Sequence, residues 1–64
     1  QWWVENLALQ DAMNRLNDRE RHIVNLRFYE GKTQMEVAQE IGISQAQVSR
    51  LEKNALRVMR NYLR

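Results

Sequence analysis

The chain has 64 residues, of which 44% are apolar and 28% are charged, with no cysteine, no proline and one histidine. A chain of this length forms one domain at most, and without cysteines it has neither a disulfide framework nor a zinc cluster. Its longest apolar run is three residues, far short of the roughly 18 needed to cross a bilayer, so we expect a soluble, intracellular protein. Because the first residue is Gln1, we also expect the chain to be part of a longer protein.

The net charge of +2 is unevenly distributed. Residues 1–32 carry five basic and five acidic side chains, and residues 33–49 carry two acidic side chains and no basic ones. Residues 50–64 carry five basic side chains and one acidic side chain, which gives this last segment a charge of +4. A basic helix can neutralise nucleic-acid phosphates, but a solvated helix face has the same composition, so the charge alone leaves both interpretations open.

Apolar residues recur at helical spacing along the whole chain, and no hairpin signal or sustained alternation is present, so the fold class is predicted to be all-α. A first helix is expected over residues 3–15. Its apolar stripe consists of Trp2, Leu9, Met13 and Leu16, separated by steps of seven, four and three.

A second helix is expected to begin after Asn17, whose side chain can accept a hydrogen bond from the backbone of Glu20 in a capping box. It is expected to continue to Gly31, which can adopt the left-handed conformation that ends a helix. Four of its apolar side chains are predicted to point inward: Ile23, Val24, Leu26 and Phe28.

The capping-box pattern recurs twice and predicts a third and a fourth helix. Thr33 with Glu36 opens the third helix, which ends at Gly42, and Ser44 with Gln47 opens the fourth, expected over residues 45–62. The inward stripe of the fourth helix is predicted to be Val48, Leu51, Ala55, Val58 and Tyr62. The three methionines, Met13, Met35 and Met59, are expected to fill the core, and His22 is expected to be solvated.

Residues 34–53 have the layout of a helix-turn-helix, in which a short helix crosses a second helix over a tight turn. Ala38 lies midway along the first helix, where a larger side chain would hold the two helices apart. Gly42 lies four residues later, where the turn needs a positive φ. The expected core-facing residues are Val37, Ile41, Ile43, Val48 and Leu51. A helical hairpin without any DNA role would satisfy part of this pattern.

If the fourth helix enters a major groove, the face opposite its core stripe would meet the DNA. That face carries Gln45, Ala46, Ser49, Arg50 and Lys53. Arginine binds guanine bidentately, glutamine pairs with adenine, and an alanine methyl can contact a thymine methyl. These residue types therefore suit the reading of base edges.

Thr33 and Ser44 lie at helix N-termini, where free backbone amides and the helix dipole favour a phosphate. Both side chains are also explained by helix capping alone. We therefore keep a phosphate contact and a purely structural cap as alternatives for each of them, Ser44 in particular.

The chain resembles region four, the C-terminal promoter-recognition region, of bacterial RNA polymerase sigma factors. The resemblance rests on the L-x-x-R-E-x-x-I-V-x-L-R-F block over 16–28, followed by TQMEVAQEIGIS and QVSRLEKNALRVMR. It covers nearly the whole chain, so residues 1–64 are interpreted as one region-four domain with its helix-turn-helix at 34–53. The segment ISQAQVSRLEK is similar in sequence to the sporulation sigma factors, the forespore type most of all.

The resemblance implies that the domain recognises the minus-thirty-five promoter element and docks on the β flap of RNA polymerase. The implied base-reading residues are Gln45, Ala46, Ser49 and Arg50. Housekeeping sigma factors carry long charged side chains at the first three of these positions, which leaves the promoter sequence open. The phosphate contacts are predicted at Arg19, Arg27, Thr33, Ser44, Lys53 and Arg57.

Anti-sigma proteins commonly hold sigma factors of this kind inactive, so a protein partner is also implied. Its candidate contact surface consists of Trp2, Trp3, Leu7, Leu56 and Leu63, because a small core is not expected to bury all of them. The tryptophans could instead cap the core or contact the rest of a longer protein.

The main alternative is a helical protein-interaction domain whose basic last helix binds an acidic protein without touching DNA. Enzymatic activity is not expected, because the eight carboxylates and the one histidine suggest no nucleophile with a base and an orienting group. We expect no cofactor, metal, membrane or small-molecule substrate. The predicted location is the bacterial cytoplasm.

Overall fold

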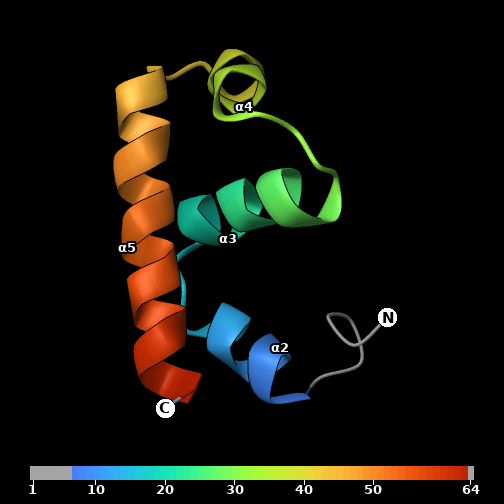
Figure 1. The fold of residues 1–64 in the computed structure, drawn as a ribbon, viewed down its shortest axis with the longest axis vertical. Helices are drawn as coiled ribbons and strands as arrows, with labels where there is room; N and C mark the ends of the chain where they lie inside the picture. The colour runs from blue at the N-terminus through green and yellow to red at the C-terminus, as the bar shows by residue number, and fades with distance from the viewer. Residues whose placement is uncertain (1–6, 64) are drawn as a thin grey trace.

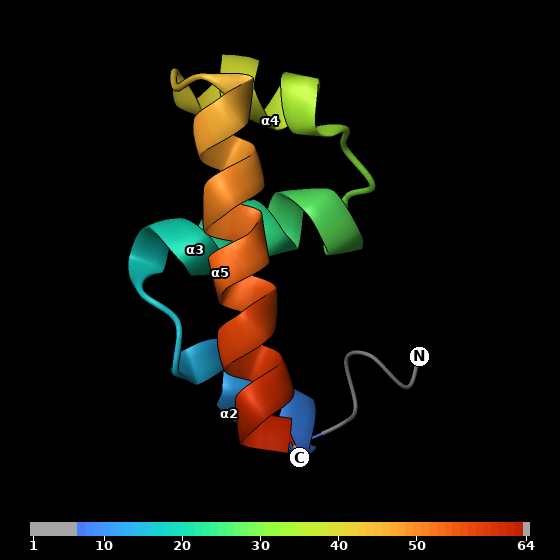
Figure 2. The same ribbon diagram turned by 60° about the vertical axis from the view of Figure 1, so that its left-hand side comes forward.

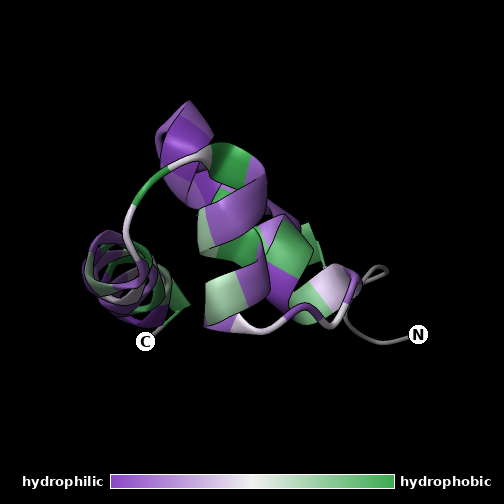
Figure 3. Cartoon of the chain, turned by 90° about the horizontal axis from the view of Figure 1, so that it is seen from above, coloured by the Kyte–Doolittle hydropathy of each residue, from purple (hydrophilic) through white to green (hydrophobic). Residues whose placement is uncertain are grey.

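The computed structural model describes residues 7–63, which form helices and connecting turns without a β-strand. The elements in chain order are α2 (Leu7–Asn14), α3 (Asp18–Val24), η1 (Asn25–Tyr29), α4 (Gln34–Ile41) and α5 (Gln45–Leu63). The long helix α5 forms one side of the molecule, and the other helices all pack against the same side of it (Figure 1). The view down the axis of α5 shows the same one-sided arrangement (Figure 3). The predicted all-α class is confirmed.

The three predicted capping boxes are formed and set the starts of α3, α4 and α5. In each, a side-chain oxygen accepts a hydrogen bond from a backbone N–H three residues later, at 2.8–3.1 Å. The later side chain accepts from the backbone of the capping residue in return, at 2.8–3.3 Å. The pairs are Asn17–Glu20, Thr33–Glu36 and Ser44–Gln47. Each pair satisfies backbone donors that the first turn of a helix would leave free.

The first helix agrees with the prediction where the structure describes it. Helix α2 spans Leu7–Asn14, and Leu9, Met13 and Leu16 are buried as predicted. Trp2 and the other residues predicted to begin this helix lie outside the described residues.

The second helix does not continue in α-helical form to Gly31. It widens into the π-helix η1, in which the N–H of Glu30 bonds to the carbonyl of Asn25 at 3.1 Å. Each π-turn contains one residue more than an α-turn, so Phe28 is rotated away from the line of Val24, four residues earlier. The prediction that Phe28 points inward is therefore wrong, and this side chain is 44% exposed.

Two buried clusters hold the helices against α5. One lies between α2, α3 and the C-terminal half of α5 and contains Leu9, Ala12, Met13, Leu16, Val24, Ala55 and Met59. The other lies between α3, η1 and the helix-turn-helix and contains Ile23, Leu26, Val37, Ala38 and Val48, with Ile41, Ile43 and Leu51 packed against it. The core positions predicted for the helix-turn-helix are therefore confirmed. Together the two clusters extend along most of the length of α5.

Besides Phe28, two more residues predicted to be in the core lie on the surface. Met35 is 56% exposed, because it follows the first residue of α4 and points away from the face that carries Val37 and Ala38. Tyr62 is exposed near the end of α5, where the guanidinium of Arg15 lies 4.6 Å from the centre of its ring. Met13 and Met59 are buried as predicted, and His22 is exposed as predicted.

Candidate nucleic-acid interface

Helices α4 and α5 are joined by a tight turn at Gly42. Its φ of 85° and ψ of 34° are left-handed, and the N–H groups of Gly42 and Ile43 both bond to the carbonyl of Ala38, at 2.8 and 3.1 Å. This closure ends α4 and turns the chain into α5 within three residues. Ala38 is buried where the two helices meet. The predicted roles of the small residue and of the glycine in this turn are confirmed.

The outer face of α5 carries residues at helical steps of four, three and four, all of them exposed: Ala46, Arg50, Lys53 and Arg57. At about 100° per residue these positions form one stripe opposite the buried face. Gln45 is exposed beside the stripe, and Ser49 lies at its edge and is half-buried. Figure 2 shows α5 in front of the other helices, so the side of α5 that faces away from them is uncovered. None of the four predicted base-reading residues is part of the core.

A second helix contributes to this interface. Arg19 of α3 and Arg50 of α5 line one open cleft of about 390 Å³, together with Gln47, Leu51 and Asn54. Two guanidinium groups and two amides in one concave surface favour an anion. The cleft therefore places a residue predicted to contact phosphate beside a residue predicted to read a base.

The remaining candidate phosphate ligands lie at or near the ends of helices or on the outer stripe. Thr33 and Ser44 are exposed N-caps whose hydroxyls already accept hydrogen bonds from Glu36 and Gln47. Lys53 is exposed on the stripe, and Arg57 beside it donates to the side chain of Asn54.

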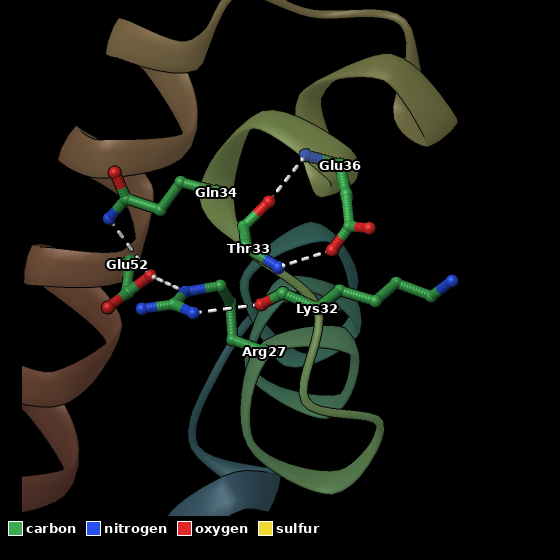
Figure 4. A network of polar contacts seen from close by, with 6 residues as sticks. All are labelled: Arg27, Lys32, Thr33, Gln34, Glu36 and Glu52. Carbon is green, nitrogen blue, oxygen red and sulfur yellow. Dashed lines mark hydrogen bonds and ion pairs between the residues drawn. The ribbon is translucent and has the colours of Figure 1, made fainter.

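Arg27 is the one predicted phosphate ligand that is engaged with the protein interior. Its Nε donates to Oε1 of Glu52 at 2.7 Å, and its Nη1 donates to the carbonyl of Lys32 at 2.8 Å. The same Oε1 accepts from Nε2 of Gln34 at 3.1 Å. Figure 4 shows Glu52 on α5 facing both Arg27 and Gln34. Sequence reasoning missed this network, and the only hint was an acidic residue in the otherwise basic last segment.

A second buried carboxylate links α3 to α5. Glu20, predicted only as a capping residue, accepts a hydrogen bond from the side chain of Asn54, and Asn54 in turn accepts from Arg57. Glu20 is buried. It therefore stabilises the start of its own helix and also fixes the position of α5.

The exposed charges before and along α4 are mostly acidic. Lys32 pairs with Glu40 at 3.3 Å, and this hydrogen-bonded ion pair raises the pKa of Lys32. Hydrogen bonds from the backbone and hydroxyl of Thr33 lower the pKa of Glu36. The positive charge of the interface therefore comes from α3 and α5, and α4 adds little to it.

An apolar groove lies toward the other end of α5. It has a volume of about 270 Å³ and is lined by Leu9, Phe28, Leu56, Met59, Arg60 and Leu63. Leu56 and Leu63, predicted to contact a partner, thus lie in one surface together with the exposed Phe28. Leu7, also predicted, is 75% exposed and is not part of the groove lining. Trp2 and Trp3 lie outside the described residues.

Two kinds of feature are absent from residues 7–63. No group of three or more histidine, cysteine, aspartate or glutamate residues in this range is placed to hold a metal ion. No helix in the same part of the chain is both long enough and apolar enough to cross a membrane.

The crossed pair α4 and α5, the left-handed glycine between them and the exposed face of the second helix define a helix-turn-helix domain. The chain belongs to the family described as Sigma-70, region 4, whose model matches residues 12–61. The resemblance to region four seen in the sequence is therefore confirmed.

The similar proteins are sigma factors. The chain is 61% identical over 61 residues to the RNA polymerase sigma-G factor of Clostridium acetobutylicum, covering 95% of the chain and 24% of that protein. It is 68% identical over 57 residues to the RNA polymerase sigma-G factor of Bacillus subtilis, covering 89% of the chain and 22% of that protein. It is 51% identical over 61 residues to the RNA polymerase sigma-F factor of Bacillus licheniformis, covering 95% of the chain and 24% of that protein.

Sigma-G and sigma-F factors are forespore sporulation sigma factors, so this finer resemblance is also confirmed. The chain spans about a quarter of the length of these relatives. No solved structure matches it.

Proposed function

We propose that the chain is the promoter-recognition domain of a forespore-type sigma factor and that it reads the minus-thirty-five element within the RNA polymerase holoenzyme. The observation that carries this proposal is the uncovered polar face of α5, which follows a glycine-closed turn in a chain of the sigma-70 region 4 family. We propose one region-four domain over residues 1–64, with the helix-turn-helix at 34–53. It acts in the bacterial cytoplasm as a transcription initiation factor rather than as an enzyme.

Base reading is assigned to the N-terminal half of α5. Arg50 binds a guanine edge, Gln45 binds an adenine edge, and Ala46 and Ser49 allow close approach to the bases. Phosphates on either side are held by Arg19, Thr33, Ser44, Lys53 and Arg57. The shared cleft of Arg19 and Arg50 supports this division, because it places a candidate phosphate ligand next to a candidate base contact.

Docking on polymerase is assigned to the apolar groove at the other end of α5. A helix or loop of the β flap with apolar side chains would cover Leu56, Leu63 and Phe28, which are exposed in the isolated domain. An anti-sigma protein that covered the same groove would compete with polymerase. Docking on the groove leaves the outer face of α5 free for DNA.

The test begins with the duplex that the chain selects from a randomised library. Arg50→Ala is expected to weaken binding to this duplex by about 1–3 kcal/mol and to relax the preference at one base pair. Lys53→Ala is the matched control, since it removes a positive charge from the same exposed stripe. It should weaken binding to selected and scrambled duplexes alike. It should also reduce the salt slope, which is the slope of the logarithm of the binding constant against the logarithm of the salt concentration, by about one unit.

Two results would contradict the proposal. If Arg50→Ala lost the same binding free energy on the selected and the scrambled duplex, Arg50 would not be a base-reading residue. Amide NMR shifts that do not change over residues 45–53 when duplex is added would favour the alternative, a protein-interaction domain that binds an acidic partner without touching DNA.

A further inference from the structure

Glu52 is a buried carboxylate on the inner face of the helix proposed to read DNA. The residue is 8% exposed and lies within one helical turn of Ser49 and Arg50. Its Oε1 accepts hydrogen bonds from two elements at once, from Arg27 of η1 at 2.7 Å and from Gln34, the first residue of α4, at 3.1 Å. One oxygen atom thus connects the three elements that meet at the helix-turn-helix (Figure 4).

The partner of Glu52 is itself held in place. The Nη1 atom of Arg27 donates to the carbonyl of Lys32 at 2.8 Å, which fixes the plane of the guanidinium before it meets the carboxylate. The π-turn η1 sets this geometry, because it places Arg27 toward α5 while Phe28 turns to the surface. Removing one member of a buried ion pair leaves a desolvated charge without compensation, so this arrangement resists small rotations of α5.

The same contacts weigh against a phosphate contact by Arg27. Two of its three guanidinium nitrogens donate within the protein, and its side chain is only 26% exposed. Arg19, Lys53 and Arg57, by contrast, are exposed. The carboxylate of Glu52 already holds Nε at 2.7 Å, so a phosphate could reach only the N–H donors of Arg27 that the protein leaves over.

We propose that Glu52 is a positioning residue that sets the rotation of the recognition helix, and that Arg27 acts on DNA through Glu52 rather than by binding a phosphate. This inference rests on the proposed promoter-reading function. It assigns promoter specificity to a pair of residues that does not touch the bases. The carboxylate fixes the direction in which Arg50 and Ser49 leave the helix, and a small rotation there misaligns a bidentate base contact.

The first experiment compares Glu52→Gln with Glu30→Gln in the full chain. Both variants lose one negative charge, but Glu30 is exposed and its nearest cation, Lys32 Nζ, lies 4.0 Å away. Binding is measured to the selected duplex and to a scrambled one across a salt series. We expect Glu52→Gln to lower the ratio of the affinity for the selected duplex to that for the scrambled duplex about tenfold, a loss within the range expected for one base contact. The salt slope should stay unchanged. Glu30→Gln should keep the wild-type ratio.

The second experiment separates positioning from phosphate binding at Arg27. Lysine keeps the positive charge but lacks the guanidinium fork that donates from two nitrogens to Glu52 and the Lys32 carbonyl, so Arg27→Lys should lose specificity as Glu52→Gln does. If Arg27→Lys keeps the wild-type ratio while Arg27→Gln reduces the salt slope by about one unit, Arg27 is a phosphate ligand and the inference is overturned.

Circular dichroism shows which variants are folded. If Glu52→Gln does not fold, Gln34→Ala, which removes one neutral donor to the same oxygen, takes its place in the comparison and should lower the affinity ratio in the same direction. A wild-type ratio in every folded variant would overturn the positioning role alone. No preference in the wild-type chain would overturn the proposed function as well.

Discussion

Replacing Gly42 with alanine tests the turn on which the interface depends. The Cβ atom of an alanine at this position would meet no atom within 4 Å other than those of its chain neighbours, so the substitution creates no clash with the rest of the fold. What remains is the cost of holding an L-residue at a φ of 85°, which is about 1–2 kcal/mol. For a domain of this size that energy corresponds to a fall in Tm of about 4–16 °C.

Urea and thermal unfolding of the wild-type chain, Gly42→Ala and Gly42→Asn would measure this cost. Asparagine tolerates the left-handed region better than alanine, so Gly42→Asn should fall between the other two. Gln39→Ala, on the exposed side of α4, is the control and should change stability by no more than about 0.5 kcal/mol. Equal stability of Gly42→Ala and wild type would refute the reasoning, because the turn would then not need the left-handed conformation.

Two further predictions concern the groove and the cap of α4. Leu56→Gln should weaken binding to the polymerase β flap about tenfold or more with little loss of stability, because Leu56 lines the groove yet is 40% exposed. Leu7→Gln, which lies outside the groove lining, is the control and should bind the flap normally. Equal binding of both variants would contradict the proposed docking site. Because hydrogen bonds from Thr33 lower the pKa of Glu36, their stabilising effect is present at neutral pH and is lost as the pH falls through the lowered pKa of the folded state. The difference in Tm between wild type and Glu36→Gln, whose amide still accepts but does not titrate, should therefore change between about pH 6 and 3, and a constant difference would count against this role.

Much of the fold was predictable because its signals are local. A capping box needs only two residues three positions apart, and each of the predicted pairs, such as Asn17 with Glu20, opens a helix in the structure. Gly42 and Ala38 were predictable for the same reason, since a tight turn and a close helix crossing restrict the residue types at single positions. The outer face of α5 followed directly from its helical period.

The features that sequence reasoning missed depend on distant residues or on a departure from the α-helical period. Glu52 and Arg27 are 25 positions apart, so no local pattern pairs them. The bond of Glu20 to Asn54 spans 34 positions and is concealed by its capping role. Phe28 was misplaced because a 3.6-residue period was extended through a π-turn.

Helix α5 belongs to both proposed interfaces, since its first half carries the face that meets DNA and its second half lines the apolar groove. Its 19 residues run without interruption and are about 28 Å long. The angle about the helix axis that separates the two surfaces is therefore set by the number of residues between Arg50 and Leu56. Inserting one residue there would advance one surface by only about 1.5 Å but turn it by about 100° relative to the other. Exposed side chains of α5 can change without altering this angle, but a change in the number of residues between the two contacts would rotate the DNA-facing surface relative to the polymerase-facing groove.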